Sequence, residues 1–97
     1  MATATVDLNE LLEVREDFRE GRPCLRGTGI TVHTIAAHRL LGMSPEEILE
    51  GFPRATLAGI HAALAYYYAH REQVDADFDE DERLALEAAR ELGAEVI

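Results

Sequence analysis

The hydrophobic and polar positions follow helical spacing through the middle of the chain, most clearly over residues 55–70, the longest run without a formal charge. Thr56 is placed to cap a helix there. The large apolar side chains recur three and four residues apart, at Leu57, Ile60, Leu64 and Tyr67 or Tyr68. Small residues occupy the opposite side: Ala58, Gly59, Ala62 and Ala65. A helix without charge all round is typically buried on more than one face. We therefore expect a central helix between the rest of its domain and a second copy of the chain.

Two shorter helices are predicted before this one. The first runs over 32–41, with Thr31 or Thr34 as its cap. The second runs over 44–51, and its opening Ser-Pro-Glu-Glu has the form of a capping box. The link between the two helices has the length and the glycine of a helix–turn–helix. A plain three-helix unit without a nucleic-acid role fits the same pattern.

The residues that precede these helices predict short extended segments. Residues 7–10 have the pattern of a capping box for one helical turn, whereas residues 12–14 alternate like a strand, and we favour the strand. Two further extended segments, 24–25 and 30–32, flank Gly27-Thr28-Gly29. That tripeptide indicates a tight turn, because glycine adopts positive φ readily. We expect a small hairpin there that leads directly into the first helix.

The last part of the chain combines an acidic run with a final helix. Residues 75–82, DADFDEDE, are nearly all acidic, and we expect them to be solvated. Residues 83–92 then predict a helix that stops at Gly93. Its apolar side chains Leu84, Ala88 and Leu92 fall on one face. This segment is expected either to bind a partner or to cover the core of its own dimer.

Charge divides the chain into three parts. Residues 1–20 carry two Arg and six acids, residues 21–71 carry five Arg and three Glu, and residues 72–97 carry two Arg and ten acids. The net charge of −10 argues against nonspecific nucleic-acid binding by the whole chain. A basic middle and an acidic tail suit different partners. The predicted division is an N-terminal strand and loop region (1–20), a core domain (21–74) and an acidic tail with a helix (75–97).

No catalytic or metal-binding pattern is found in the sequence. None of the four histidines forms a His-x-x-x-His pair, and Cys24 has no second cysteine to assist it. We expect Cys24 to be an inert core thiol and Ser44, the one serine, to be a helix cap. We therefore expect neither an enzyme nor a cofactor. The lone cysteine and the lack of a secretory signal indicate the cytoplasm, and the uncharged run is shorter than the about 20 residues of a membrane span.

Three segments between Gly21 and Tyr66 resemble the domain-of-unknown-function 433 family, whose members resemble VapB-type antitoxins. The segments are GRPCLRGTGITV, GMSPEEILEGFP and LAGIHAALAY, in the family's order and spacing. The family's usual Arg after Gly-Thr is Gly29 here. The resemblance implies a homeodomain-like three-helix helix–turn–helix core, usually dimeric, preceded by short β-strands. With the extra C-terminal helix, the expected fold is mainly α.

The resemblance also implies the antitoxin of a type II toxin–antitoxin pair, which neutralises a PIN-like ribonuclease toxin and regulates its own operon by binding operator DNA. A stand-alone DNA-binding regulator and a dimeric interaction module without DNA are the alternatives. DNA phosphate contacts are expected from Arg22, Arg26, Arg39 and Arg54, with little base readout. Toxin contacts are expected from Arg83, Leu84, Ala88, Arg90 and Leu92. Dimer contacts are expected from Ala58, Ala62, Ala65 and Tyr66.

Overall fold

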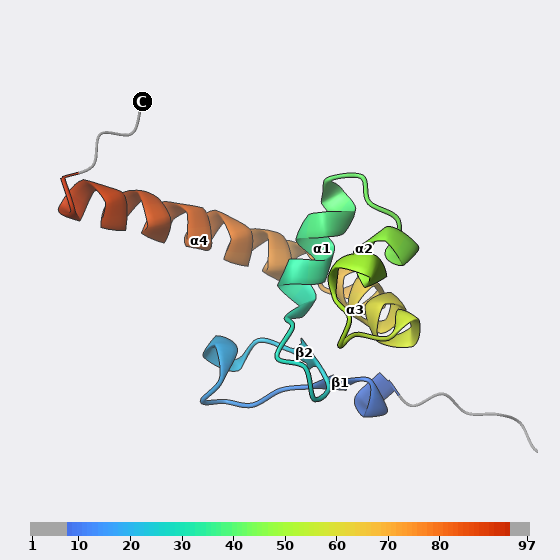
Figure 1. The fold of residues 1–97 in the computed structure, drawn as a ribbon. Coiled ribbons are helices and arrows are strands. Elements are labelled where there is room, and N and C mark those ends of the chain that lie inside the picture. The colour runs from blue at the N-terminus through green and yellow to red at the C-terminus, as the bar shows by residue number, and fades with distance from the viewer. Residues whose placement is uncertain (1–7, 94–97) are drawn as a thin grey trace, which may run out of the picture.

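The computed structural model describes residues 8–93 and is mainly helical (Figure 1). The helices are α1 (Val32–Leu40), α2 (Pro45–Gly51), α3 (Leu57–Ala69) and α4 (Arg71–Glu91). The strands β1 (Leu12–Glu13) and β2 (Cys24–Leu25) form a two-stranded antiparallel sheet. Of two short 3-10 helices, η1 (Leu8–Glu10) precedes β1, and η2 (Arg19–Gly21) lies between β1 and β2. None of the helices in residues 8–93 is both long and apolar enough to cross a membrane.

The first residues of α1, α2 and α3 are fixed by the caps that the sequence predicts. Thr31 Oγ1 accepts a hydrogen bond from the N–H three residues on, at 3.0 Å. Ser44 and Glu47 form a complete capping box. Thr56 Oγ1 accepts from the N–H of Gly59 at 3.0 Å. These bonds satisfy donors that the first turn of a helix leaves free, so the helix starts are confirmed.

Helix α3 is the central element, as predicted, and contacts α1, α2, α4 and both strands. The largest fully buried side chains around it are Val32, Ile35, Ile48, Ile60, Tyr67 and Val74. The side chain of Leu25 in β2 packs against α3 at Gly59. A Cβ at Gly59 would lie 3.2 Å from Leu25 Cδ2 and 3.1 Å from Thr56 Oγ1. The missing side chain therefore lets the sheet pack against the helix.

The strand pairing differs from the expected hairpin. β2 pairs with β1, in a register that places Leu12 opposite Leu25. Around the turn predicted at 27–29, which is present, the pairing is reduced to one bridge between Cys24 and Thr31. Because Thr31 already caps α1, the chain turns helical before a second strand can form. The strand predicted at the N-terminal side is confirmed as β1.

The helical turn predicted for residues 7–10, as the alternative to the strand, is present as well. It is η1, which lies directly before β1, so the two alternatives occur one after the other. The residue predicted to cap this turn, Asp7, lies outside the described residues.

Helix α4 differs most from the expectation. The acidic run 75–82 is solvated at most of its positions, as predicted, since residues 76 and 79–82 are exposed. It is not a separate segment, however, because α4 runs without interruption from Arg71, and the predicted boundary at 74–75 lies within α4. Val74 is buried in the core and Phe78 packs against the core. Two apolar side chains four residues apart give this acidic segment a face toward the body. The predicted stop at Gly93 is confirmed by its φ of 73°.

Candidate interaction surfaces

Three carboxylates in the first half of α4 bind side chains of the body. The pairs are Tyr67–Asp75 at 2.9 Å, His33–Asp77 at 2.8 Å and Arg22–Asp81 with two bonds of 2.8 and 2.9 Å. The Arg22 guanidinium lowers the pKa of Asp81 below its usual value. Burial and then the bond to Asp75 raise the pKa of Tyr67. We call these three pairs the α4 clamp, since together they fix the direction in which α4 leaves the body.

The His33–Asp77 pair is the most enclosed part of the α4 clamp. His33 is 5% exposed, and its ring meets the ring of Phe78 edge-on, with centroids 5.7 Å apart. Its Nδ1 atom has no hydrogen-bond partner among the described residues. Among the described residues, the bond between Nε2 and Asp77 is therefore the one side-chain hydrogen bond of this buried ring.

The second half of α4 extends beyond the body (Figure 1). From the buried Val74 onward, one helix face repeats at spacings of four and three residues: Val74, Phe78, Asp81, Ala85, Ala88 and Leu92. Its outer part is exposed. We define the distal stripe as Leu84, Ala85, Ala88 and Leu92, of which Leu84 is 48% and Leu92 85% exposed. Three of the five predicted toxin contacts lie on the distal stripe.

The other two predicted toxin contacts are arginines in different situations. Arg83 donates to Glu80 and Glu87, one helical turn away on either side. Arg90 is exposed in the last turn of α4. Because Arg83 is already paired within its own helix, Arg90 is the more available cation near the distal stripe.

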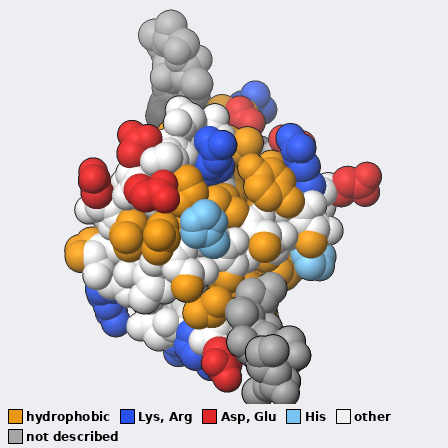
Figure 2. All heavy atoms as spheres, turned by 90° about the vertical axis from the view of Figure 1, so that its right-hand side faces the viewer, with side chains coloured by type: hydrophobic (Ala, Val, Ile, Leu, Met, Phe, Trp, Pro, Cys, Tyr) orange, Lys and Arg blue, Asp and Glu red, His pale blue; other side chains and the backbone are white. Residues whose placement is uncertain are grey.

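A groove of about 890 Å³ lies between β1 and the second half of α3, and we call it the β1–α3 groove. Its apolar lining consists of Leu12, Val14, Pro23, Ala62, Ala65, Tyr66 and Ala69, and its polar lining of Asn9, Glu13, Arg15, Arg26 and His70. Three of the four predicted dimer residues line it, whereas Ala58 is exposed elsewhere on α3. Figure 2 views the side that carries α2, α3 and β1 and shows hydrophobic side chains gathered over much of it. Val14 is 61% exposed.

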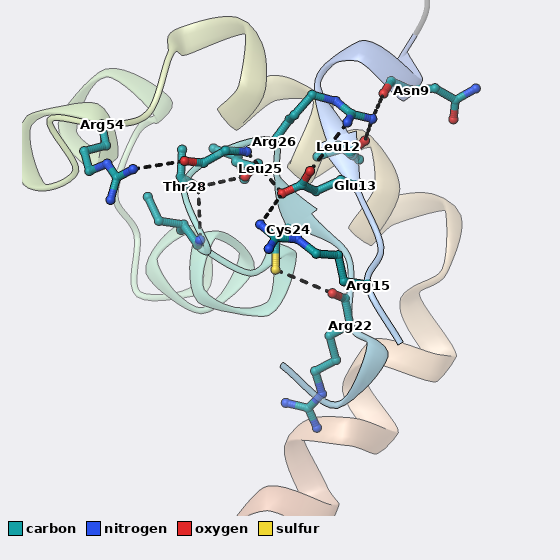
Figure 3. Close-up of polar contacts among 12 residues, drawn as sticks. Asn9, Leu12, Glu13, Arg15, Arg22, Cys24, Leu25, Arg26, Thr28 and Arg54 are labelled. Carbon is teal, nitrogen blue, oxygen red and sulfur yellow. Dashed lines mark hydrogen bonds and ion pairs between the residues drawn. The ribbon is translucent and has the colours of Figure 1, made fainter. Parts of the chain in front are cut away.

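Three of the four arginines predicted to contact DNA are held by internal hydrogen bonds. These bonds run from Arg22 to Asp81, from Arg26 to the carbonyl oxygens of Asn9 and Leu12, and from Arg54 to that of Gly27. Figure 3 shows the guanidinium groups of Arg26 and Arg54 directed at these oxygen atoms. Arg39 is exposed and has a single long contact, 3.4 Å, to the carbonyl of Met43. Arg22, Arg26 and Arg54 therefore have internal partners, although Arg26 and Arg54 are also exposed, and the phosphate contacts of all four arginines stay predictions.

Cys24 lies in the core, as predicted. It is 3% exposed, and its Sγ lies 3.5 Å from the carbonyl oxygen of Arg22. Burial raises the pKa of its thiol, which favours the protonated form over the thiolate. Within residues 8–93, no three His, Cys, Asp or Glu side chains are grouped so that they could hold a metal ion.

The α4 clamp was missed by the sequence analysis. Its carboxylates lie within a run that is acidic at almost every position, so composition does not distinguish Asp75, Asp77 and Asp81 from their neighbours. The available signal was the pair Val74 and Phe78, two apolar residues one helical turn apart inside that run.

This geometry defines a small, mainly helical protein with a two-stranded sheet, an open groove and a projecting helix. The chain belongs to the DUF433 family, described as proteins of unknown function, whose family model matches residues 12–67. A solved structure of a DUF433 member protein from Anabaena variabilis ATCC 29413 is similar, with a TM-score of 0.66 and 30% identity. That similarity covers 72% of this chain and 69% of the other. No curated protein matches the chain. The family match ends before α4.

Proposed function

We propose that this chain is the antitoxin of a type II toxin–antitoxin pair and that it inhibits a PIN-like ribonuclease through the distal stripe of α4. The observation that carries the proposal is a helix clamped to the body at one half, with exposed leucines on the other half. The resemblance to VapB-type antitoxins supplies the class of the partner. In this proposal Arg90 faces the acidic metal site for which PIN-like nucleases are known, because Arg83 already pairs with Glu80 and Glu87.

Three physical properties of α4 support this role. Each leucine that becomes fully buried on docking contributes roughly 1.5–3 kcal/mol. The stripe is already helical, so docking costs less ordering than it would for an unfolded segment. Residues 72–97 carry ten acids and two Arg, which favours fast encounter with a basic, RNA-binding surface.

Co-expression with the neighbouring nuclease gene tests the proposal. The double variant Leu84→Glu/Leu92→Glu should fold, because both side chains are exposed, and should fail to protect cells from the nuclease. The matched control is Leu41→Glu, since Leu41 is 80% exposed on the body, at the end of α1. The control should protect like the unchanged chain. If the double variant still protects, the distal stripe is not the inhibitory surface.

Operator binding is the second part of the proposal, supported by three packed helices with the short links typical of a helix–turn–helix. The exposed side chains in the first turns of α3 are Leu57, Ala58 and His61. None of them presents the paired groups that read a base. Binding would therefore rest on phosphate contacts, for which Arg39 is available. In a promoter-binding assay, Arg39→Ala should reduce the salt slope by about 1.8 for two lost contacts per dimer. An unchanged slope would rule Arg39 out.

A further inference from the structure

Two surfaces of the described chain have complementary properties and no occupant among residues 8–93. They are the β1–α3 groove and the distal stripe of α4. We propose that, in the free protein, two copies of the chain pair so that the distal stripe of each packs into the β1–α3 groove of the other. The second half of α4 of one copy lies in the β1–α3 groove of its partner, and the partner's α4 lies in the groove of the first.

The side chains of the two surfaces are complementary in size, as close packing of two helices requires. Along α3, the groove is lined by Ala62, Ala65 and Ala69, whose small side chains leave space above the helix. The stripe offers Leu84 and Leu92, which are exposed in the single chain. Large side chains of one helix packed between small ones of another allow a short distance between the helix axes.

Their charges also suit one another. Arg15 and Arg26 lie at the groove, with side chains 53% and 52% exposed, and Glu13 bonds to both. The groove therefore has a surplus of one positive charge, besides His70. The half of α4 that carries the stripe, residues 82–91, has three Glu and two Arg and so a surplus of one negative charge. The groove and the outer half of α4 therefore carry net charges of opposite sign, each of one unit.

The position of the groove explains why the occupant comes from a second copy. Ala69 and His70, at one end of the groove lining, directly precede α4. The α4 clamp directs α4 away from the body, so its outer half cannot fold back into its own groove (Figure 1). Two α4 helices that run antiparallel bring the stripe of each to the start of the other. One twofold axis then fills both grooves at once.

This dimer is a resting form with respect to the proposed nuclease binding. The distal stripe can contact one surface at a time, so a nuclease that binds the stripe must take the place of the partner copy's groove. The dimer itself requires no nuclease. Experiments on the chain alone therefore test it, whatever the outcome for the nuclease.

Directed cross-linking tests which surfaces meet. A copy with Ala65→Cys, mixed with a copy with Ala88→Cys, should form a disulfide-linked heterodimer on mild oxidation. The matched control replaces Ala65→Cys by Ala58→Cys, an exposed alanine on α3 outside the groove, and should not cross-link. Cross-linking of Ala65→Cys to itself, or equal cross-linking of the control, would mean that two α3 helices meet instead and would overturn the proposal.

Light scattering gives the second readout. The unchanged chain should have about twice the mass of one 10.7 kDa copy at micromolar concentration, and raised salt should weaken the dimer. Leu84→Glu/Leu92→Glu should be monomeric with an unchanged helical spectrum, whereas Leu41→Glu should remain dimeric. A monomeric unchanged chain, or a double variant that still dimerises, would overturn the proposal.

Discussion

The two halves of α4 share one apolar spacing, but their charges and surroundings differ. Residues 71–81 carry six acids and one Arg, whereas residues 82–91 carry three acids and two Arg. In the first half, Val74 is 1% exposed, and the α4 clamp joins three carboxylates to side chains from α1, α3 and the segment before β2. In the second half, Leu92 is 85% exposed and Arg83 pairs with glutamates of its own helix. One continuous helix therefore packs into the core with its first half and is exposed along its second half.

The difference shows what joins an acidic helix to a body. Exposed ion pairs within one helix contribute little, whereas a carboxylate that satisfies a buried donor prevents a large cost. The buried Val74 and the enclosed His33–Asp77 pair should thus carry most of the attachment. Substitutions in the first half of α4 should therefore lower the free energy of unfolding more than matched substitutions in the second half.

The largest effect is expected at Val74. Val74→Ala removes apolar contacts and leaves a cavity, which should lower the free energy of unfolding by about 2 kcal/mol. The matched change in the second half is Leu84→Ala, at a side chain 48% exposed in the single chain, with an effect within about 0.5 kcal/mol when unfolding starts from the monomer at low protein concentration. Urea unfolding followed by circular dichroism measures both. Equal effects would mean that the two halves are attached alike.

The next effect is expected at Asp77. Asp77→Ala leaves Nε2 of the buried His33 without its partner, which should cost about 1.5 kcal/mol of stability. The matched control is Asp79→Ala, two residues away and exposed, which should change stability little. Thermal unfolding of the two variants makes the comparison. A loss of similar size in both would reflect helix charge rather than the buried bond.

A smaller, pH-dependent effect is expected at Asp81. The guanidinium of Arg22 lowers the pKa of the folded-state carboxyl, so its stabilisation is present above the unfolded pKa. It is lost from about pH 4 downward, as pH falls through the folded pKa. Because both side chains are partly exposed, Asp81→Asn should cost at most about 1 kcal/mol at neutral pH. The difference in unfolding free energy from the unchanged chain should shrink in acid, and a constant difference would exclude the charge as its cause.

The smallest effect is expected at Arg83. Arg83→Ala removes two exposed pairs within the helix and should lower the stability of the outer half of α4 only slightly. Amide exchange should become faster in residues 84–91, with little change in residues 71–78. Exchange that rises equally along α4 would show that the two halves open together.

Local patterns predicted most of the body. The caps at Thr31, Ser44 and Thr56 each bond to an N–H three residues away, so their chemistry is fully contained in a short stretch of sequence. The central position of α3 followed from its lack of charge, and the core location of Cys24 from its apolar neighbours. The pairing of β2 with β1 did not follow, because its partner lies across the η2 segment rather than across the nearest turn.

For the interaction surfaces, sequence placed residues on the right elements without showing their neighbours. Three of the predicted dimer residues do line one groove, but β1 supplies its other wall, and Ala58 lies outside it. The predicted phosphate-binding arginines looked alike in sequence. Folding distinguishes them by their partners and not by exposure alone: Arg26, Arg39 and Arg54 are all exposed, but Arg22, Arg26 and Arg54 bond to acceptors far away in the sequence, whereas the contact of Arg39 is to Met43 in its own neighbourhood.

The sequence by itself determined where the three helices of the body begin, which helix is central, and that the last helix carries an apolar face. These properties depend on side chains within about four residues of one another. Tertiary structure alone decided that α4 begins at Arg71 and that half of its apolar face is buried. The contacts responsible join His33 to Asp77 and Arg22 to Asp81, across 44 and 59 residues of chain. Such pairs form once the body has brought their backbones together, so no pattern within a short stretch of sequence specifies them.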